Sequence, residues 1–280
     1  MDMGNDKPYI LSEEEQAEFS AYIANRFDGC SEISALDTDY LKPWESIVFY
    51  ADMFGAAQAV NDKVCPKRPV EFREPDGVSI RVEDSFAGKI PVIRVRDVAD
   101  FEELVTNAAY KGVRPDNIDR TGASFIHGKT VRYVILSYKP YSNVTAGELG
   151  LDDEEWAEKS MQLRFGHECT HFFTKQTYGV TNNILHDEIM ADFIGMYEAF
   201  GFYKADWFLR FMGMDGNDSG RMIFYTKELS ENVSKEVYGM MREAAYGLER
   251  WSETDGFVDL DAAERIKKMC DAGLQGMKYI

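Results

Sequence analysis

The segment His167-Glu168-Cys169-Thr170-His171 is the feature that most constrains how this 280-residue chain can fold. Side chains four residues apart lie on one face of an α-helix, one turn apart, so the two histidines meet if the segment is helical. Two neutral imidazoles placed in this way can bind one Zn²⁺, with the intervening glutamate beside the metal. The chain has only four histidines, and this segment contains two of them. The sequence therefore predicts a helix that carries part of a zinc site.

A catalytic zinc usually has three protein ligands and keeps a fourth position for water. Glu188 is the best candidate for the third ligand, and its neighbours His186 and Asp187 are the alternatives. Asp192 follows Glu188 by four residues, so both carboxylates share one helix face. We expect Asp192 to accept a hydrogen bond from the outer nitrogen of a ligating histidine, which would fix its tautomer.

The pattern around these residues predicts a helical second half. Asp152 begins a helix that runs to about Tyr178, where Gly179 ends it. A second helix is expected over 185–200, and a long loop over 179–184 would fold it back against the first. Small residues in the second helix would allow close packing between the two: Ala191, Gly195 and Ala199. Further helical runs are predicted over 205–212, 225–251 and 259–277.

The first half mixes helices with strands. Helices are predicted over 12–27, 43–60 and 100–111, the first with Ser12 and Glu15 as a capping box and the last with Asp100 and Glu103. Alternating apolar and polar residues predict strands over 78–82, 91–96, 123–126 and 130–138, with a hairpin turn at 127–129. The chain is therefore expected to be α+β, with an N-terminal α+β lobe (1–150) that holds a small sheet and a C-terminal helical lobe (151–280). The two lobes are expected either as separate units or as parts of one core.

Charge and composition limit the partners and the compartment. The chain has 49 acidic and 31 basic residues, a net charge of −18, which argues against nucleic acids and anionic membranes. This charge is compatible with basic or neutral peptides. The first six residues lack the basic and apolar pattern of a secretory signal, and no run of 18 apolar residues is present. The four cysteines form no C-x-x-C pair, so we expect a cytoplasmic protein with free thiols.

The motif H-E-C-T-H at 167–171, followed by E-I-M-A-D at 188–192, resembles the gluzincin group of zinc metallopeptidases. The resemblance covers about residues 164–196, and 16 residues separate His171 from Glu188, somewhat fewer than in thermolysin-like members. It implies a zincin-like fold with an active-site cleft between the lobes, and zinc held by His167, His171 and Glu188. It also implies that Asp192 orients a histidine ligand and that the strand over 130–138 lies at a sheet edge and binds the peptide, although a central strand is an equal alternative. The three-histidine metzincin pattern is absent, because the residue six after His171 is Thr177.

Glu168 would act as the general base that takes a proton from the metal-activated water and passes it to the leaving amine. Cys169 points about 100° away from His167 around the helix and is expected in the core. An oxyanion donor is also needed, and Tyr178 and His186 are the leading candidates. Other candidates are His127, Arg164 and Tyr138.

The sequence thus favours a zinc-dependent hydrolase, most simply a metallopeptidase that acts on a peptide or protein. Two alternatives stay open: a non-catalytic binding or regulatory protein on a metallopeptidase-like scaffold, and a zinc hydrolase of a non-peptide amide. An intact Glu168 argues against the first alternative, because metal binding alone does not need it. Substrate, cleavage position and oligomeric state do not follow from the sequence.

Overall fold

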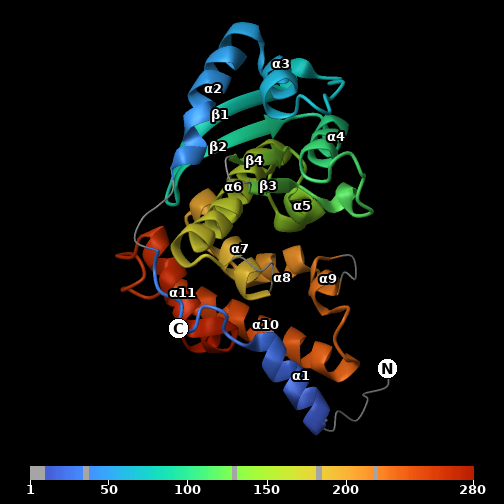
Figure 1. Cartoon of the computed structure of the whole chain (residues 1–280). Helices are drawn as coiled ribbons and strands as arrows, with labels where there is room; N and C mark the ends of the chain where they lie inside the picture. The colour runs from blue at the N-terminus through green and yellow to red at the C-terminus, as the bar shows by residue number, and fades with distance from the viewer. Residues whose placement is uncertain (1–9, 34–37, 128–130, 181–184, 217–219) are drawn as a thin grey trace.

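A computed structural model describes residues 10–33, 38–127, 131–180, 185–216 and 220–280, and Figure 1 shows their arrangement. A small sheet with flanking helices forms one end of the molecule, and helices alone form the other end. The α+β prediction is confirmed. The first six residues, most of the predicted turn at 127–129 and most of the predicted loop at 179–184 lie outside the described residues.

Within the described residues the sheet has four strands: β1 (Val78–Ser85), β2 (Gly88–Val95), β3 (Ala123–His127) and β4 (Arg132–Ser137). Their spatial order is β1-β2-β4-β3; β2 and β4 are parallel, and the other two pairs are antiparallel. Of the two alternatives for the strand over 130–138, the central position is confirmed and the edge position is wrong, because β4 lies between β2 and β3. Val134, Ile135 and Leu136 are fully buried, as in a strand covered on both faces. The edge strand beside β4 is β3.

Helices cover both faces of this sheet (Figure 1). One face packs against α2 (Lys42–Phe54), α3 (Ala56–Ala59) and α4 (Val98–Ala108), through a core that includes Ile80, Ile93 and Ile135. The other face packs against the long helix α6 (Asp153–Tyr178), where Val92, Val134 and Leu136 meet Phe172 and Cys169. The burial of Cys169 agrees with its expected place in the core. Successive strand residues point alternately to these two cores, so one face of the sheet packs directly against α6.

The remaining helices form a third apolar core with one side of α6. They are α5 (Ala146–Leu149), α7 (Leu185–Phe200), α8 (Ala205–Met212), α9 (Met222–Thr226), α10 (Glu231–Ser252) and α11 (Ala262–Gly276). The prediction of a single helix over 225–251 is wrong, because two separate helices, α9 and α10, cover this region. Ser230 lies between them with extended backbone at ψ 155° as the N-cap of α10.

The first helix of the chain, α1 (Glu13–Ile23), belongs to this helical end of the molecule. Ser12 and Glu15 form the predicted capping box. The side chain of Glu18 accepts hydrogen bonds from the backbone and hydroxyl of Ser230, and Tyr22 donates to the backbone carbonyl of Tyr225. The N-terminal helix therefore packs beside α10, far from the sheet (Figure 1). The division at residue 150 stays a prediction.

Two local predictions in the first half are corrected. The helix predicted over 43–60 ends at Phe54, because Gly55 has φ 91°, in the left-handed region that favours glycine. The cap of α4 is Asp97, whose side chain accepts from the backbone of Asp100. Asp100 itself is buried and accepts from the backbone of residues 73 and 74. A buried tertiary role thus replaces the expected capping role.

Among the described helices, none combines the length and the apolar character needed to cross a bilayer. All four cysteines have free thiols.

Candidate metal centre

The motif lies in the middle of α6, where the helix backbone is regular on both sides. Asp152 caps the start of α6 and accepts from two backbone N–H groups, and Gly179 ends the helix at φ 71°. Both boundaries were predicted. The side chain of Arg164 also anchors α6, because it donates to the carbonyls of Ser137 at 2.7 Å and Lys139 at 2.8 Å. The helix is thereby tied to the end of β4.

Two glycines bring α7 into close contact with α6. A Cβ atom on Gly195 would lie 2.5 Å from the carbonyl oxygen of Leu163, and one on Gly166 would lie 3.0 Å from the Cα of Gly195. The approach at Gly195 is too short for any side chain, and the approach at Gly166 is tighter than most Cβ contacts. The predicted close packing is confirmed at Gly195, and it positions the first turn of α7 opposite the two histidines.

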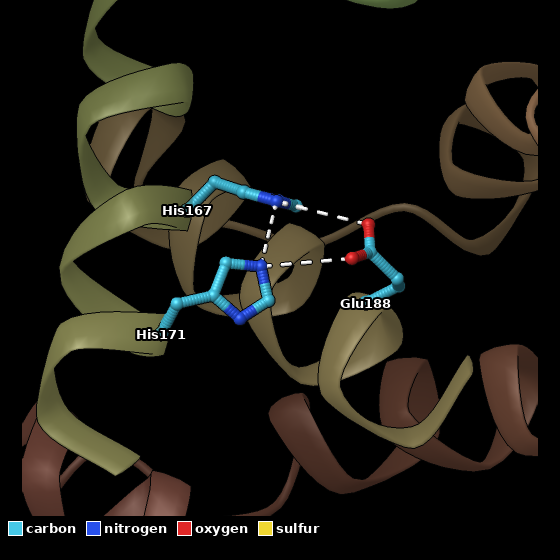
Figure 2. Close-up of side chains that lie close together, drawn as sticks. All are labelled: His167, His171 and Glu188. Atoms are coloured by element: carbon cyan, nitrogen blue, oxygen red, sulfur yellow. Dashed lines mark hydrogen bonds and ion pairs between the residues drawn. The ribbon is translucent and has the colours of Figure 1, made fainter. Parts of the chain in front are cut away.

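His167, His171 and Glu188 converge on one point between the two helices (Figure 2). The Nε2 atoms of the histidines are 3.1 Å apart. The Glu188 carboxylate places one oxygen 3.6 Å from Nε2 of His171 and the other 3.8 Å from Nε2 of His167. Ligands about 2.1 Å from a tetrahedral zinc lie about 3.4 Å from one another, so the donor set and its spacing fit this metal. All three residues are buried.

Asp192 lies behind His167, on the side away from this point. Its Oδ1 is 2.7 Å from Nδ1 of His167, which leaves Nε2 directed at the cluster. Burial disfavours the charged imidazole of His167 and by itself would lower its pKa. The hydrogen bond and the charge of Asp192 outweigh this effect, so the pKa of His167 is raised. Burial, and then the charge of His167, lower the pKa of His171 to about 4, so this imidazole is neutral at pH 7. A neutral imidazole is the form that binds a metal.

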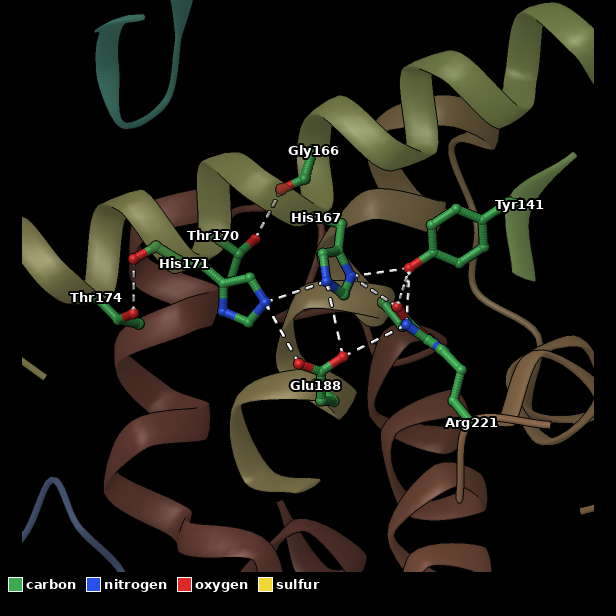
Figure 3. Close-up of polar contacts among 9 residues, drawn as sticks. Tyr141, Gly166, His167, Thr170, His171, Thr174, Glu188 and Arg221 are labelled. Carbon is green, nitrogen blue, oxygen red and sulfur yellow. Dashed lines mark hydrogen bonds and ion pairs between the residues drawn. The ribbon is translucent and has the colours of Figure 1, made fainter. Parts of the chain in front are cut away.

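Three further side chains lie beside the cluster, and the sequence patterns did not indicate them. Figure 3 shows two of them, Tyr141 and Arg221. The hydroxyl of Tyr141 lies 2.9 Å from Nδ1 of His167 and donates to Asp192. Arg221 pairs with Asp192 and donates to Glu188 at 3.4 Å. Burial opposes the charge of Arg221, but Asp192 raises its pKa well above the usual value. Two carboxylates and one guanidinium are thus held together beside the histidines.

Tyr225, in α9, is the third of these side chains. Burial, then the charge of Glu188 and a hydrogen bond to its carboxylate, raise the pKa of Tyr225. The phenol is therefore protonated at pH 7 and can donate a hydrogen bond. Arg221 and Tyr225 come from one short segment more than thirty residues after Glu188. No local pattern marks them, because only the tertiary fold brings α9 to the cluster.

Glu168 faces an open cavity beside the cluster. Burial raises the pKa of Glu168, although the charge of His167 opposes the rise. The cavity has a volume of about 710 Å³, within the usual range for ligand sites. Its walls come from the segment before and along β3, from α6, from the start of α7 and from α9. Besides the cluster and Glu168, it is lined by Tyr110, Asn117, Arg120, Thr121, Ala123, Ser124, Phe125, His127, Lys175, Arg221, Phe224 and Tyr225.

The two leading oxyanion candidates from the sequence lie elsewhere. The Nε2 of His186 is 3.0 Å from the backbone carbonyl of Met269 in α11, and its ring packs edge-on against Phe27. Tyr178 packs against the same phenylalanine. Neither side chain lines the cavity, because residues 178 and 186 face the apolar core rather than the sheet. Of the other candidates, His127 lines the cavity, and Arg164 is committed to backbone carbonyls.

The protein is α+β, and it has a cluster of two histidines and one glutamate whose ligand atoms could hold a metal ion. The family of unknown function DUF7005 matches residues 60–132 and 130–277, so the chain belongs to that family. No curated protein and no solved structure matches the chain. Because the function of this family is unknown, membership assigns no activity to the chain.

Proposed function

We propose that this protein is a zinc-dependent hydrolase, a metallopeptidase of gluzincin type. One observation carries the proposal: His167, His171 and Glu188 converge at metal-ligand spacing, and Glu168 faces the cavity beside them. The alternative of a structural zinc site is less well supported, since such sites usually have four cysteine or histidine ligands and no cavity.

In this proposal the three converging side chains would hold the zinc, and the metal would supply a Lewis acid that lowers the pKa of water toward neutrality. Glu168 takes the proton from the attacking water and delivers it to the leaving nitrogen. Its raised pKa suits both transfers, because a carboxyl group that titrates nearer to neutrality exchanges a proton in either direction. Asp192 holds the imidazole of His167 in one tautomer.

The substrate would lie in the cavity between β3 and α6. Among the strands that the structure describes, β3 is at the sheet edge beside α6, and residues 123, 124, 125 and 127 line the cavity. An extended peptide can hydrogen-bond to such an edge by strand addition. Tyr225 is the best donor for the developing oxyanion, since its protonated hydroxyl lies next to the metal ligand Glu188. This role replaces the ones expected for Tyr178 and His186.

The first test is the metal content of the purified protein by elemental analysis. We expect about one zinc per chain in the wild type, little in His171→Ala, and an unchanged content in His127→Gln. The last variant is a matched control, because His127 lines the cavity but lies outside the cluster. Absence of zinc in the wild type, even after zinc is added back, would overturn the proposal.

The second test is hydrolysis of a peptide library by zinc-loaded wild type and Glu168→Gln. The amide keeps the shape of the side chain but cannot take a proton, so cleavage should fall by about 10²-fold or more while the zinc content stays the same. Full activity in Glu168→Gln would remove Glu168 from the mechanism. A zinc-loaded wild type that cleaves no peptide would favour the non-catalytic binding protein or a non-peptide amide substrate.

A further inference from the structure

The described lining of the cavity has more basic than acidic residues, whereas the whole chain has more acidic than basic ones. Acidic residues outnumber basic ones by 49 to 31. Among the described residues that line the cavity, however, the only acids are Glu168 and Glu188, which the proposed reaction already uses. The other charged residues of the lining are all basic: Arg120, Lys175 and Arg221.

These basic groups stand on both sides of the cluster. Lys175 is on α6, one helical turn beyond His171. Arg120 precedes β3, in the short 3₁₀ turn η4 (Ile118–Arg120). It also lines the adjoining hollow of about 150 Å³ that continues past His167 and Glu168 toward Tyr141. A chain lying along β3 would therefore pass the reactive centre with a basic side chain near each end.

Arg120 and Lys175 are not neutralised within the part of the chain that the structure describes. The Nζ of Lys175 donates to the backbone carbonyl of Gly179 at 3.1 Å, which is an uncharged partner. The guanidinium of Arg120 lies over the ring of Phe224, 5.2 Å from its centre. Neither side chain pairs with a described acid. Arg221 differs, because it is already paired with Asp192 and donates to Glu188.

We propose that the cavity selects acidic peptides, with substrate carboxylates on either side of the cleaved bond bound by Arg120 and Lys175. This inference rests on the proposed function. A strongly acidic chain repels an acidic peptide at long range, so the two side chains must act at short range inside the cavity. Arginine and lysine recognise carboxylates through charge-assisted hydrogen bonds, which neutral amides of the same shape do not form as strongly. The cavity thus selects against the basic peptides that the net charge alone would favour.

The test compares three versions of one short peptide: with glutamates flanking the central peptide bond, with glutamines, and with lysines. Binding to zinc-loaded Glu168→Gln is followed by fluorescence anisotropy, and cleavage by the wild type is followed by kcat/KM. We expect the glutamate peptide to be preferred over its glutamine isostere by about fivefold or more in both measurements. The preference should shrink as salt is added.

The same peptides are then tested on Arg120→Gln and Lys175→Gln, with Arg73→Gln and Lys227→Gln as matched controls outside the cavity. Each cavity substitution should reduce the glutamate-to-glutamine ratio, and the controls should keep it. The charge reversal Lys175→Glu should move the preference toward the lysine peptide.

The outcomes separate the two proposals. Cleavage of all three peptides at equal rates would overturn the acidic preference and leave the hydrolase intact. Preferred binding of the glutamate peptide without any cleavage would keep the recognition by Arg120 and Lys175 and overturn the hydrolase. A preference that survives both cavity substitutions would assign recognition to other residues and overturn this inference.

Discussion

Two of the three candidate ligands are oriented by another group behind them. His167 is held from its far nitrogen by Asp192, and Glu188 accepts a hydrogen bond from Arg221. Tyr141 contacts His167 and Asp192 together. Loss of a group that orients a ligand in this way typically weakens metal affinity by about 10–100-fold.

The substitution Asp192→Asn tests this support. The amide cannot provide the negative charge that strengthens His167 as a base and pairs with Arg221, so zinc affinity should fall about 10–100-fold. Competition with a chelator measures the zinc affinity. Urea denaturation of the metal-free protein shows whether the substitution also lowers its stability. Glu198→Gln is the matched control on the same helix, since Glu198 lies outside the cluster. Unchanged affinity in Asp192→Asn would mean that Asp192 serves only to bind Arg221.

The substitution Tyr225→Phe tests the proposed oxyanion donor. Loss of one donor at a developing charge costs about 10²–10³-fold in kcat, so we expect that fall in kcat with little change in KM. Tyr178→Phe should have a much smaller effect, because Tyr178 packs against Phe27 outside the cavity. Loss of zinc from Tyr225→Phe would instead indicate that this hydroxyl positions Glu188.

The crossing of α6 and α7 is the structural element on which the cluster depends. Its geometry is set by contact between backbones at residues 166 and 195 rather than by interlocking side chains. A shift of one helix relative to the other would change the distances between Glu188 and the histidines. Metal binding and packing of the two helices are therefore coupled.

The substitution Gly195→Ala tests this coupling. The new Cβ atom would meet the carbonyl of Leu163 at 2.5 Å, so the helices must move apart. We expect a loss of about 1–3 kcal/mol in the free energy of unfolding, together with weaker zinc binding. Gly239→Ala in α10 is the matched control, because its Cβ would contact nothing within 4 Å. The control should gain about 0.5–1 kcal/mol from its better helix propensity. Equal behaviour of the two variants would contradict the packing argument.

Sequence patterns correctly predicted the helices whose first and last residues depend only on capping residues close by in the chain. Asp152 and Gly179 define α6 by capping and by a left-handed turn, and both effects act within a few residues. The central place of β4 was not predictable with certainty, because it depends on parallel pairing with β2 across an intervening helix and strand. The same limit applies within the site: H-E-x-x-H is a local motif, whereas Arg221 reaches it only through the path of the chain.

At the level of the whole molecule, a buried ion pair joins the layers on the two faces of the sheet. Glu102, in α4, accepts from the Nζ of Lys139 at 2.8 Å. The carbonyl of Lys139 in turn accepts from Arg164 of α6 at 2.8 Å. Lys139 also donates to the carbonyl of Asp119 at 2.9 Å, in the turn that carries Arg120. The pair therefore links the helices behind the sheet to the walls of the cavity.

This pair should make the stability of the molecule depend on pH. Burial by itself raises the pKa of Glu102, but the hydrogen bonds and charges of Lys139 and Arg114 outweigh it and lower the pKa below 4.5. Since the folded protein holds this proton less tightly than the unfolded chain, the pair stabilises fully above about pH 4.5. Its contribution disappears as the pH falls through the lower folded-state value.

The substitution Glu102→Gln should therefore lower the free energy of unfolding by about 3 kcal/mol at pH 7, because it leaves the buried ammonium of Lys139 without its countercharge. Urea denaturation between about pH 7 and pH 3 should show the gap to the wild type narrowing at the acidic end, where the wild-type carboxylate becomes protonated. Glu103→Gln is the matched control, because the adjacent side chain is exposed, and it should follow the wild type throughout. A gap that stays constant with pH would show that the loss comes from packing around Glu102. In that case the connection between the α4 layer and the cavity wall would depend on the backbone contacts of Lys139 and Arg164 rather than on charge.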